Sequence, residues 1–311
     1  MNYSIIFPGQ GSQSIGMLSD LNQNFSVVNE VFQEASDAIN VDLWKIINED
    51  QEALNLTENT QPVMLAAGYA TYKILSEEIS LVPLSMAGHS LGEYTALVAS
   101  NSLNFFDAIQ LVRKRGELMQ AAVPTGTGSM AAILGLEDTH IIEICKKANN
   151  KGVVEAVNFN SPGQVVIAGE KNAVAYACEL MKEAGAKRAL VLPVSVPSHC
   201  SLMKDAAVKF KNHIEPINFK TGNVRVIHNV DADYAGDVET IKTKLVEQLY
   251  MPVLWTSSIN KMRDSGVGRL IEAGPGRVLT GLTRRIDKSL SASAIIDVSS
   301  LKSTIEEISN A

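Results

Sequence analysis

One short motif in this sequence carries a clear chemical signal: Gly88-His89-Ser90-Leu91-Gly92, which matches the pattern Gly-x-Ser-x-Gly. Two glycines at this spacing allow a tight turn from a strand into a helix, and the turn exposes the serine hydroxyl. The helix that begins after the turn also presents free backbone N–H groups to a developing oxyanion. Ser90 is therefore the predicted nucleophile, and a glycine turn without chemistry is the alternative.

A serine nucleophile needs a base within hydrogen-bond reach, and this base is most often a histidine. His199 lies in a loop between a predicted strand and a predicted helix, where functional residues concentrate. His228 ends a predicted strand, so it remains a second candidate. His89 adjoins the nucleophile and is predicted to be structural, while His140 and His213 fall in helices whose polar faces are predicted to be solvated.

The order of the serine and the histidines along the chain bears on the class of enzyme. In an α/β-hydrolase the acid and then the histidine follow the serine, and the histidine usually lies late in the chain. Here no histidine follows His228 in a chain of 311 residues. The standard esterase layout therefore fits this sequence badly.

The elements that must position these residues alternate between short apolar strands and helices. We predict strands at 3–7, 84–87, 225–228, 270–272 and 294–297. We predict helices at 24–39, 63–75, 93–99, 105–122 and 201–213, two more around Pro252, one from Arg277 and one at the end of the sequence. Alternation of this kind favours an α/β fold built on a sheet.

The pattern changes between Pro124 and Pro193. Strands and helices are predicted here at 130–134, 138–148, 153–157, 164–168, 172–184 and 188–192. Their order, βαββαβ, is that of a ferredoxin-like unit. We therefore predict a small subdomain at 124–193, inserted into a larger α/β subdomain made of 1–123 and 194–311.

Composition and charge exclude several classes of protein. Hydrophobic residues make up 46% and charged residues 20%, which is typical of a folded globular chain. The net charge of −7 argues against nucleic acid or an anionic membrane as a partner. Three distant cysteines suit neither a disulfide framework nor a zinc site, and we expect them to be reduced. No window approaches a membrane span, so we expect a cytoplasmic protein.

Several longer segments resemble one known family, the bacterial-type, stand-alone malonyl-CoA:acyl carrier protein transacylases. The resemblance covers essentially the whole chain, in the order and spacing of the family. Its fold is a hydrolase-like large subdomain with a parallel sheet core and an inserted ferredoxin-like small subdomain, which agrees with the predicted elements. The matching segments are FPGQGSQ at 7–13, GHSLGEY at 88–94, RKRGELM at 113–119, NSPGQ at 160–164, PSH at 197–199, QLYMPVLW at 248–255 and EAGPG at 272–276.

The resemblance implies a role for each residue that matches a family motif. Ser90 corresponds to the acylated nucleophile and His199 to its general base. Gln248 corresponds to the residue whose backbone carbonyl orients the histidine, the task of aspartate in a triad. Gln10 and Leu91 correspond to the residues whose backbone N–H groups form the oxyanion hole.

Arg115 decides, within this resemblance, which acyl group is transferred. Without the resemblance, we would predict that Arg115 is a solvated residue on a helix. Its planar guanidinium can bind a carboxylate with two parallel hydrogen bonds, and a malonyl group carries a carboxylate that acetyl lacks. The resemblance therefore implies a malonyl substrate. Further candidates for the substrate channel are Met119, Asn158, Asn160 and Ser198.

The implied reaction is a ping-pong transfer of malonyl from malonyl-CoA to the phosphopantetheine thiol of holo acyl carrier protein, a step of fatty acid biosynthesis. No metal, nucleotide or redox cofactor is expected, and Gly9-Gln10-Gly11 lacks the spacing of a dinucleotide site or P-loop. We expect a monomer that meets the carrier transiently. A serine thioesterase or esterase and a non-catalytic scaffold are the alternatives, and Ser198 before the histidine leaves the exclusion of methylmalonyl open.

Overall fold

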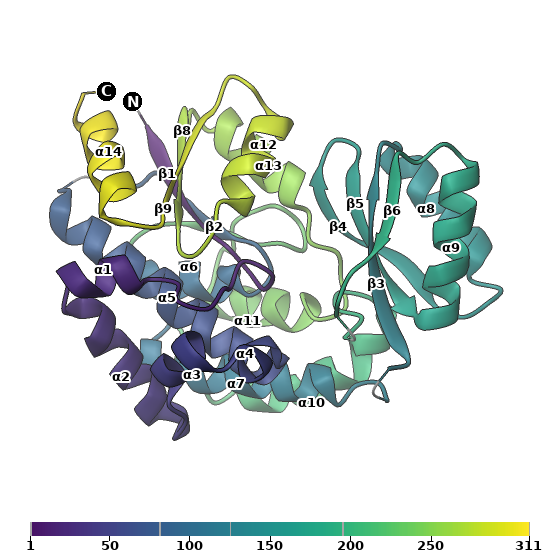
Figure 1. The fold of residues 1–311 in the computed structure, drawn as a ribbon, viewed down its shortest axis with the longest axis horizontal. Helices are drawn as coiled ribbons and strands as arrows, with labels where there is room; N and C mark the ends of the chain where they lie inside the picture. The colour runs from purple at the N-terminus through teal and green to yellow at the C-terminus, as the bar shows by residue number, and fades with distance from the viewer. Residues whose placement is uncertain (1, 81, 125, 195, 311) are drawn as a thin grey trace.

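A five-stranded parallel sheet forms the centre of the larger part of the molecule (Figure 1). The computed structural model describes residues 2–80, 82–124, 126–194 and 196–310. All neighbouring strands in this sheet run parallel. In spatial order the strands are β7 (Val226–Ile227), β2 (Met86–Gly88), β1 (Tyr3–Phe7), β8 (Arg269–Ala273) and β9 (Ser291–Ile295).

The sequence of β1 shows why this sheet is covered on both faces. Successive side chains of a strand point to opposite faces, and a strand buried on both faces reads as a continuous apolar run. Ile5 and Phe7 belong to the core cluster on one face, and Ile6 belongs to the cluster on the other. The Tyr3–Phe7 segment is buried throughout. This pattern agrees with the position of β1 at the centre of the sheet.

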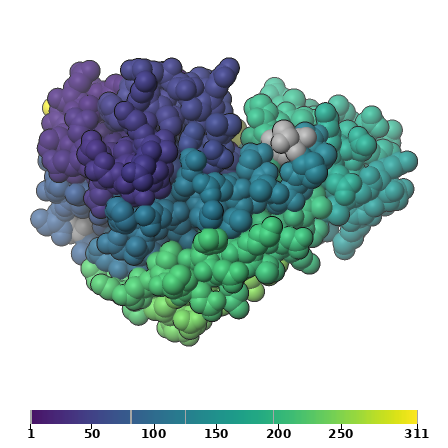
Figure 2. All heavy atoms as spheres, turned by 90° about the horizontal axis from the view of Figure 1, so that it is seen from below, coloured from purple at the N-terminus to yellow at the C-terminus, as the bar shows by residue number. Residues whose placement is uncertain are grey.

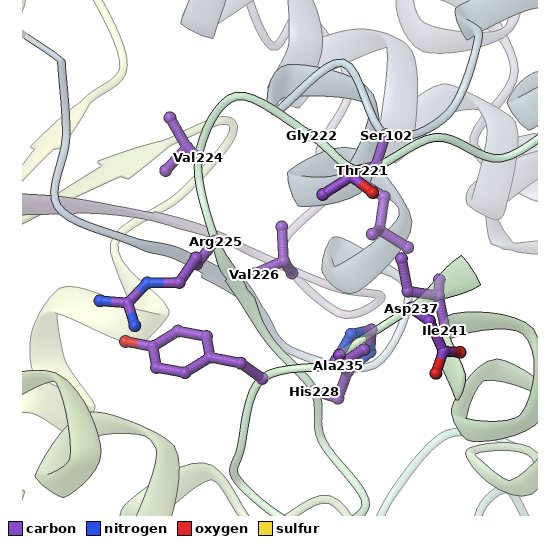
Figure 3. A pocket seen from close by; sticks show the side chains of 13 residues that line it. Ser102, Thr221, Gly222, Val224, Arg225, Val226, His228, Ala235, Asp237 and Ile241 are labelled. Carbon is purple, nitrogen blue, oxygen red and sulfur yellow. The ribbon is translucent and has the colours of Figure 1, made fainter. Parts of the chain in front are cut away.

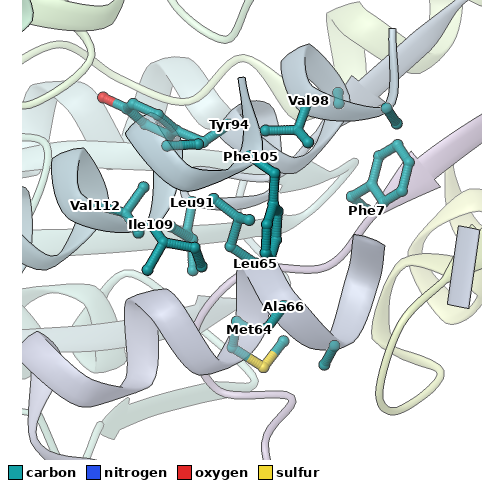
Figure 4. Close-up of a cluster of buried hydrophobic side chains, with 14 of the residues drawn as sticks. Phe7, Met64, Leu65, Ala66, Leu91, Tyr94, Val98, Phe105, Ile109 and Val112 are labelled. Atoms are coloured by element: carbon teal, nitrogen blue, oxygen red, sulfur yellow. The ribbon is translucent and has the colours of Figure 1, made fainter. Parts of the chain in front are cut away.

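Most helices of the larger part pack on the Phe7 face of the sheet. Figure 4 shows the centre of this packing, where side chains of α5, α6 and α7 meet Phe7. The helices whose side chains join this core are α1 (Ser19–Asn24), α2 (Val27–Ile39), α3 (Leu43–Glu49), α4 (Gln51–Asn55), α5 (Thr57–Glu78), α6 (Gly92–Ala99), α7 (Phe105–Gln120), α10 (Lys204–Ile214), α11 (Val238–Glu247) and α14 (Val298–Ser309). On the opposite face lie α12 (Trp255–Asp264) and α13 (Val278–Ile286). On the side seen in Figure 2, the N-terminal helices, α7 and the segments around α10 lie next to one another.

A second, antiparallel sheet forms a separate lobe, on the right in Figure 1. It contains β4 (Val154–Ser161), β5 (Gln164–Glu170), β3 (Gly128–Leu134) and β6 (Arg188–Val191), in that spatial order, with α8 (Asp138–Ala148) and α9 (Lys171–Glu183) packed on one face. The chain order βαββαβ agrees with the ferredoxin-like prediction. The opposite face packs Met130 and Val157 against Cys200, which follows His199. The boundaries of the subdomain, 124 and 193, stay a prediction.

Two elements differ from their predicted bounds for identifiable reasons. Strand β4 continues beyond the predicted end at 157, because Asn158 and its neighbours pair with β5 and Phe159 N–H donates to Val253 O at 3.0 Å. Helix α5 begins at Thr57, before Pro62, although an interior proline removes one helical hydrogen bond. Arg113 Nη1 donates to the carbonyl oxygen of Glu58 at 3.3 Å, the acceptor that Pro62 leaves free.

Smaller differences affect the ends of other elements and three short helices. The strands predicted at 84–87, 225–228 and 294–297 occupy 86–88, 226–227 and 291–295, and α1, α3 and α4 were not predicted. Over the described residues, no helix combines the length and the apolar character that a membrane span requires.

Candidate active site

A cleft of about 490 Å³ opens where the second sheet meets the larger part of the molecule. Ser90 and His199 lie in its wall with Gln10, and Asn158 and Ser198 also line it. The other lining residues are Gly11, Gln13, Asn55, Thr57, His89, Met130, Leu192, Pro193, Val194 and Val196. Both lobes therefore contribute to the space in front of the serine.

Ser90 occupies the sharp turn that the sequence predicts. Strand β2 ends at Gly88 and helix α6 begins at Gly92, and a Cβ on Gly88 would lie 1.8 Å from the backbone carbon of Gly92. The turn places Ser90 in the left-handed region at φ 52°, a conformation that costs a non-glycine residue about 1–3 kcal/mol. Asn229 holds the turn in place: its Oδ1 accepts from Ser90 N–H at 2.7 Å, and its Nδ2 donates to Gly88 O at 2.7 Å.

The hydroxyl of Ser90 contacts His199 and not His228. Ser90 Oγ and His199 Nε2 are 2.7 Å apart, and His199 Nδ1 lies 2.6 Å from the backbone oxygen of Gln248. A carbonyl oxygen can only accept, so the ring proton sits on Nδ1 and leaves Nε2 free to accept from the serine hydroxyl. His228 instead places Nδ1 2.7 Å from Glu93 Oε1. The geometry therefore favours His199 as the base.

The surroundings of His199 keep its imidazole neutral. Burial first, and the positive charge of Arg115 second, lower the pKa of His199 from 6.5 to about 3. The hydrogen bond to Gln248 opposes this shift. A neutral imidazole at neutral pH can accept the serine proton, as a general base must.

We expect the rate of enzyme acylation to stay flat as the pH falls from about 8 to about 5. The base acts in its neutral form, so activity is lost only when the pH falls toward the lowered pKa of about 3. A histidine with an ordinary pKa of 6.5 would lose about 30-fold over the same range. The measurement is kcat/KM for acylation against pH; a drop of that size, in protein that circular dichroism shows to be folded, would contradict the assignment.

Arg115 brings a buried positive charge to the nucleophile. Its side chain is 1% exposed, and Nη2 lies 3.3 Å from Ser90 Oγ. Nη1 donates to Gln61 Oε1 at 2.9 Å and Nη2 to Gln248 Oε1 at 2.9 Å, and the Tyr94 ring lies 5.4 Å from the guanidinium. Every one of these partners is neutral, and no ion pair with Arg115 occurs in the part of the chain that the structure describes.

Burial lowers the pKa of Arg115, which means that the site stabilises this cation less well than water does. A buried charge without a charged partner is expensive to maintain. An anionic group bound beside Ser90 would supply the missing countercharge. The site is therefore suited to an acyl group that carries its own carboxylate.

Gln248 connects the histidine, the arginine and the serine turn. Besides its contacts with His199 and Arg115, its Nε2 donates to Ser90 O at 3.0 Å and to Glu93 Oε2 at 2.7 Å. Its side chain is fully buried. A serine nucleophile, a neutral histidine oriented by a carbonyl and a cation together form an arrangement suited to acyl transfer.

Comparison with known proteins identifies the family to which this arrangement belongs. Residues 4–303 match the family described as acyl transferase domain. The chain belongs to this family.

Relatives of this acyl transferase share about half of its residues over nearly their whole length. It is 52% identical over 306 residues to the malonyl CoA-acyl carrier protein transacylase of Haemophilus influenzae, covering 98% of each chain. It is 50% identical over 305 residues to the Escherichia coli K12 protein of the same name, covering 98% of this chain and 99% of the other. It matches a solved malonyl-transacylase in complex with a type II PKS acyl-carrier protein with a TM-score of 0.97 and 50% identity, covering 99% and 100% of the two chains. These comparisons confirm the predicted family and α/β fold.

The structure also places the predicted oxyanion-hole residues and the predicted channel residue Met119. Gln10 lines the same cleft as Ser90, and Leu91 follows Ser90 as the N-cap residue of α6. The Ser90 amide is not free to donate to an oxyanion, because it already donates to Asn229 Oδ1. Met119 is buried, and its Sδ lies 3.7 Å from Gln61 Nε2.

Asn160 differs from the other channel candidates in its surroundings. Its Oδ1 lies 2.7 Å from His89 Nε2, and the His89 ring packs 5.5 Å from that of Trp255. Asn160 is buried and is not among the residues that line the cleft, unlike Asn158. The structure thus places Asn160 behind the serine turn, where it holds His89.

Sequence reasoning missed three residues that contact the site: Gln61, Glu93 and Asn229. Glu93 gave a usable signal, because it is the one charged residue in a helix of small and apolar residues that follows the serine. Gln61 and Asn229 gave none beyond polarity, since polar residues next to Pro62 or after a strand are common in loops and caps.

The described residues show no cluster of metal ligands, and their three cysteines are buried. No group of three or more His, Cys, Asp or Glu side chains that could hold a metal occurs among the described residues. All three cysteines are buried and free. Burial raises the pKa of the Cys145 and Cys200 thiols to about 12, so neither competes with Ser90 as a nucleophile.

Proposed function

We propose that this acyl transferase moves the malonyl group of malonyl-CoA to the phosphopantetheine thiol of holo acyl carrier protein through a malonyl-serine intermediate. The observation that carries the proposal is the buried Arg115 cation 3.3 Å from Ser90 Oγ, surrounded by neutral partners. A malonyl thioester has the free carboxylate that such a cation binds, and an acetyl thioester does not. The names of the relatives at about 50% identity support the same substrate and acceptor.

In the first half-reaction, Ser90 Oγ bonds to the thioester carbonyl carbon while His199 Nε2 takes the hydroxyl proton. The backbone N–H groups of Gln10 and Leu91 hold the resulting oxyanion. The carbon–sulfur bond then breaks, and coenzyme A leaves as a thiol with the proton from His199. Arg115 binds the malonyl carboxylate throughout this half-reaction.

In the second half-reaction, His199 removes the proton of the carrier thiol, and the sulfur attacks the malonyl-serine ester. Ser90 leaves and regains its proton from His199. A thioester is consumed and a thioester is formed, so the transfer has no redox step and needs no cofactor. Met119, Asn158 and Ser198 are proposed to line the path of the acyl chain, and Gln248 to orient His199.

The proposed product is malonyl-carrier protein, the building block for fatty acid biosynthesis. A cytoplasmic location and a monomeric state stay predictions from the sequence.

The Arg115→Ala variant tests the proposed substrate. A hydrogen bond to a charged group contributes about 1.5–3 kcal/mol, so the preference for malonyl-CoA over acetyl-CoA should fall by about tenfold to a hundredfold. The measurement is the ratio of the two acylation rates. Lys114→Ala is the matched control, since Lys114 is a cation on the same helix that pairs with Glu117 at 2.9 Å. An unchanged ratio in Arg115→Ala would contradict the proposal.

A further inference from the structure

Glu93 is a buried carboxylate next to the nucleophile that the reaction described above does not use. It lies in the first turn of α6, three residues after Ser90, and is fully buried. Its Oε1 lies 2.7 Å from His228 Nδ1, and its Oε2 accepts from Asn229 N–H at 2.9 Å and from Gln248 Nε2 at 2.7 Å. Within the described residues, no arginine or lysine forms an ion pair with it. Burial of such a group needs an explanation.

The contact with Gln248 determines which way the amide of Gln248 points. Gln248 Nε2 donates to two acceptors, Glu93 Oε2 and Ser90 O, and Gln248 Oε1 accepts from Arg115 Nη2. A reversed amide would set its oxygen against a carboxylate and its NH₂ against a guanidinium, and both contacts would be repulsive. The carboxylate at Glu93 and the cation at Arg115 thus select the same orientation.

We propose that Glu93 is a positioning residue that fixes the Gln248 amide and thereby holds the Arg115 guanidinium beside Ser90 for the carboxylate of the acyl group. The inference rests on the proposed function, since it concerns how the same site selects malonyl. A neutral amide separates the two buried charges, so Arg115 keeps an anion nearby without being neutralised by it. A carboxylate in direct contact with Arg115 would compete with the substrate for the same guanidinium.

The second carboxylate oxygen of Glu93, Oε1, is held by the buried His228. His228 is 1% exposed, and its backbone N–H donates to Asp233 O at 3.0 Å. His228 also borders a cavity of about 60 Å³ with Ala235 and Asp237 (Figure 3). The hydrogen bonds of Glu93 among the described residues all go to protein groups, and Gln248 links it to Arg115.

A purely structural role for Glu93 predicts a different result. Glu93 also joins α6 to the segment at 228–229, so its replacement will lower stability in either case. A structural role alone would lower both acylation rates together. The positioning role lowers the malonyl rate more than the acetyl rate, because only malonyl uses Arg115.

The test is a double-mutant cycle on the full-length protein, read out as the ratio of single-turnover acylation rates with malonyl-CoA and acetyl-CoA. In Glu93→Gln we expect this ratio to fall by about tenfold, the size of one lost hydrogen bond to a charged group. In Gln248→Leu, which keeps the backbone carbonyl for His199, we expect a similar fall. In the double variant we expect no further fall, because Glu93 acts through Gln248.

Glu272→Gln is the matched control for burial of the charge. Glu272 is also fully buried, and its carboxylate accepts the backbone N–H groups of Leu279 and Thr280 away from the site. We expect this variant to lose stability and to keep the ratio of the two rates within about twofold of the native protein.

An unchanged ratio of the malonyl and acetyl rates in folded Glu93→Gln would overturn the inference. The inference would also be overturned if the double variant showed a lower ratio than Gln248→Leu by the full factor that Glu93→Gln causes alone. If Glu93→Gln does not fold, Gln248→Leu alone decides, and an unchanged ratio there overturns the inference. A native protein that shows no preference for malonyl would instead overturn the proposed function itself.

Discussion

The Ser90→Ala variant is expected to form no acyl-enzyme with any coenzyme A thioester and to lose transfer activity by about 10⁴-fold or more. The reason is that Ser90 Oγ is the one hydroxyl that lies within reach of both His199 Nε2, at 2.7 Å, and Arg115 Nη2, at 3.3 Å, among the described residues. Its alanine replacement keeps the turn, because the Asn229 contact is made by the backbone of residue 90. The measurement is the intact mass of the protein after incubation with malonyl-CoA.

Ser76→Ala provides the control for Ser90→Ala. Ser76 is an exposed serine on α5 that hydrogen-bonds to the backbone of Lys73. The Ser76→Ala variant should be acylated at the native rate. An adduct on Ser90→Ala at the native level would show that the acyl group is carried elsewhere.

The His199→Ala variant should show the second-largest effect, a fall of about 10²–10⁴-fold in the rate of acylation. Among the described residues, His199 and Arg115 are the side chains that hydrogen-bond to Ser90 Oγ, and Arg115 can only donate. The measurement is single-turnover acylation by malonyl-CoA. His213→Ala, at an exposed position on α10, is the matched control and should leave the rate unchanged. Native-like acylation by His199→Ala would require another base, and His228 would have to be reconsidered.

Local patterns in the sequence were sufficient to predict the serine turn and the second sheet. Gly88 and Gly92 impose the turn around Ser90 through short-range sterics, which a motif records directly. The six elements between 128 and 191 could be predicted because each is either a short helix with an apolar face or a short apolar strand, bounded by turn residues. These features depend on residues that are close in the sequence, so a local sequence pattern can predict them.

The environment of Arg115 could not be predicted in the same way. Read alone, Arg115 is a polar residue on a helix, and only the resemblance to a family suggested more. Its burial depends on Gln61 and Gln248, which lie 54 and 133 positions away in the chain. The support of Ser90 by Asn229 spans 139 positions. Contacts at such separations are set by the packing of α5, α6, α7 and α11 around the sheet, and no local pattern reports them.

Helix α5 shows how such a distant contact can also override a local rule. Pro62 predicts a helix that begins after it, yet the helix starts at Thr57. The compensating hydrogen bond comes from Arg113, on a different helix. The earlier start places Gln61 inside the helix, from which its side chain reaches Arg115. The error in the predicted helix boundary and the missed site residue therefore have the same cause.

Intact-protein mass spectrometry with a carrier chase tests the central claim most directly. The protein is incubated briefly with malonyl-CoA, acetyl-CoA or methylmalonyl-CoA, and holo acyl carrier protein is then added. We expect one malonyl adduct, formed in preference to acetyl, absent from Ser90→Ala and transferred to the carrier. A malonyl adduct that is released as free malonate without the carrier would instead identify a thioesterase, and the absence of any adduct on the native protein would contradict the assignment of Ser90.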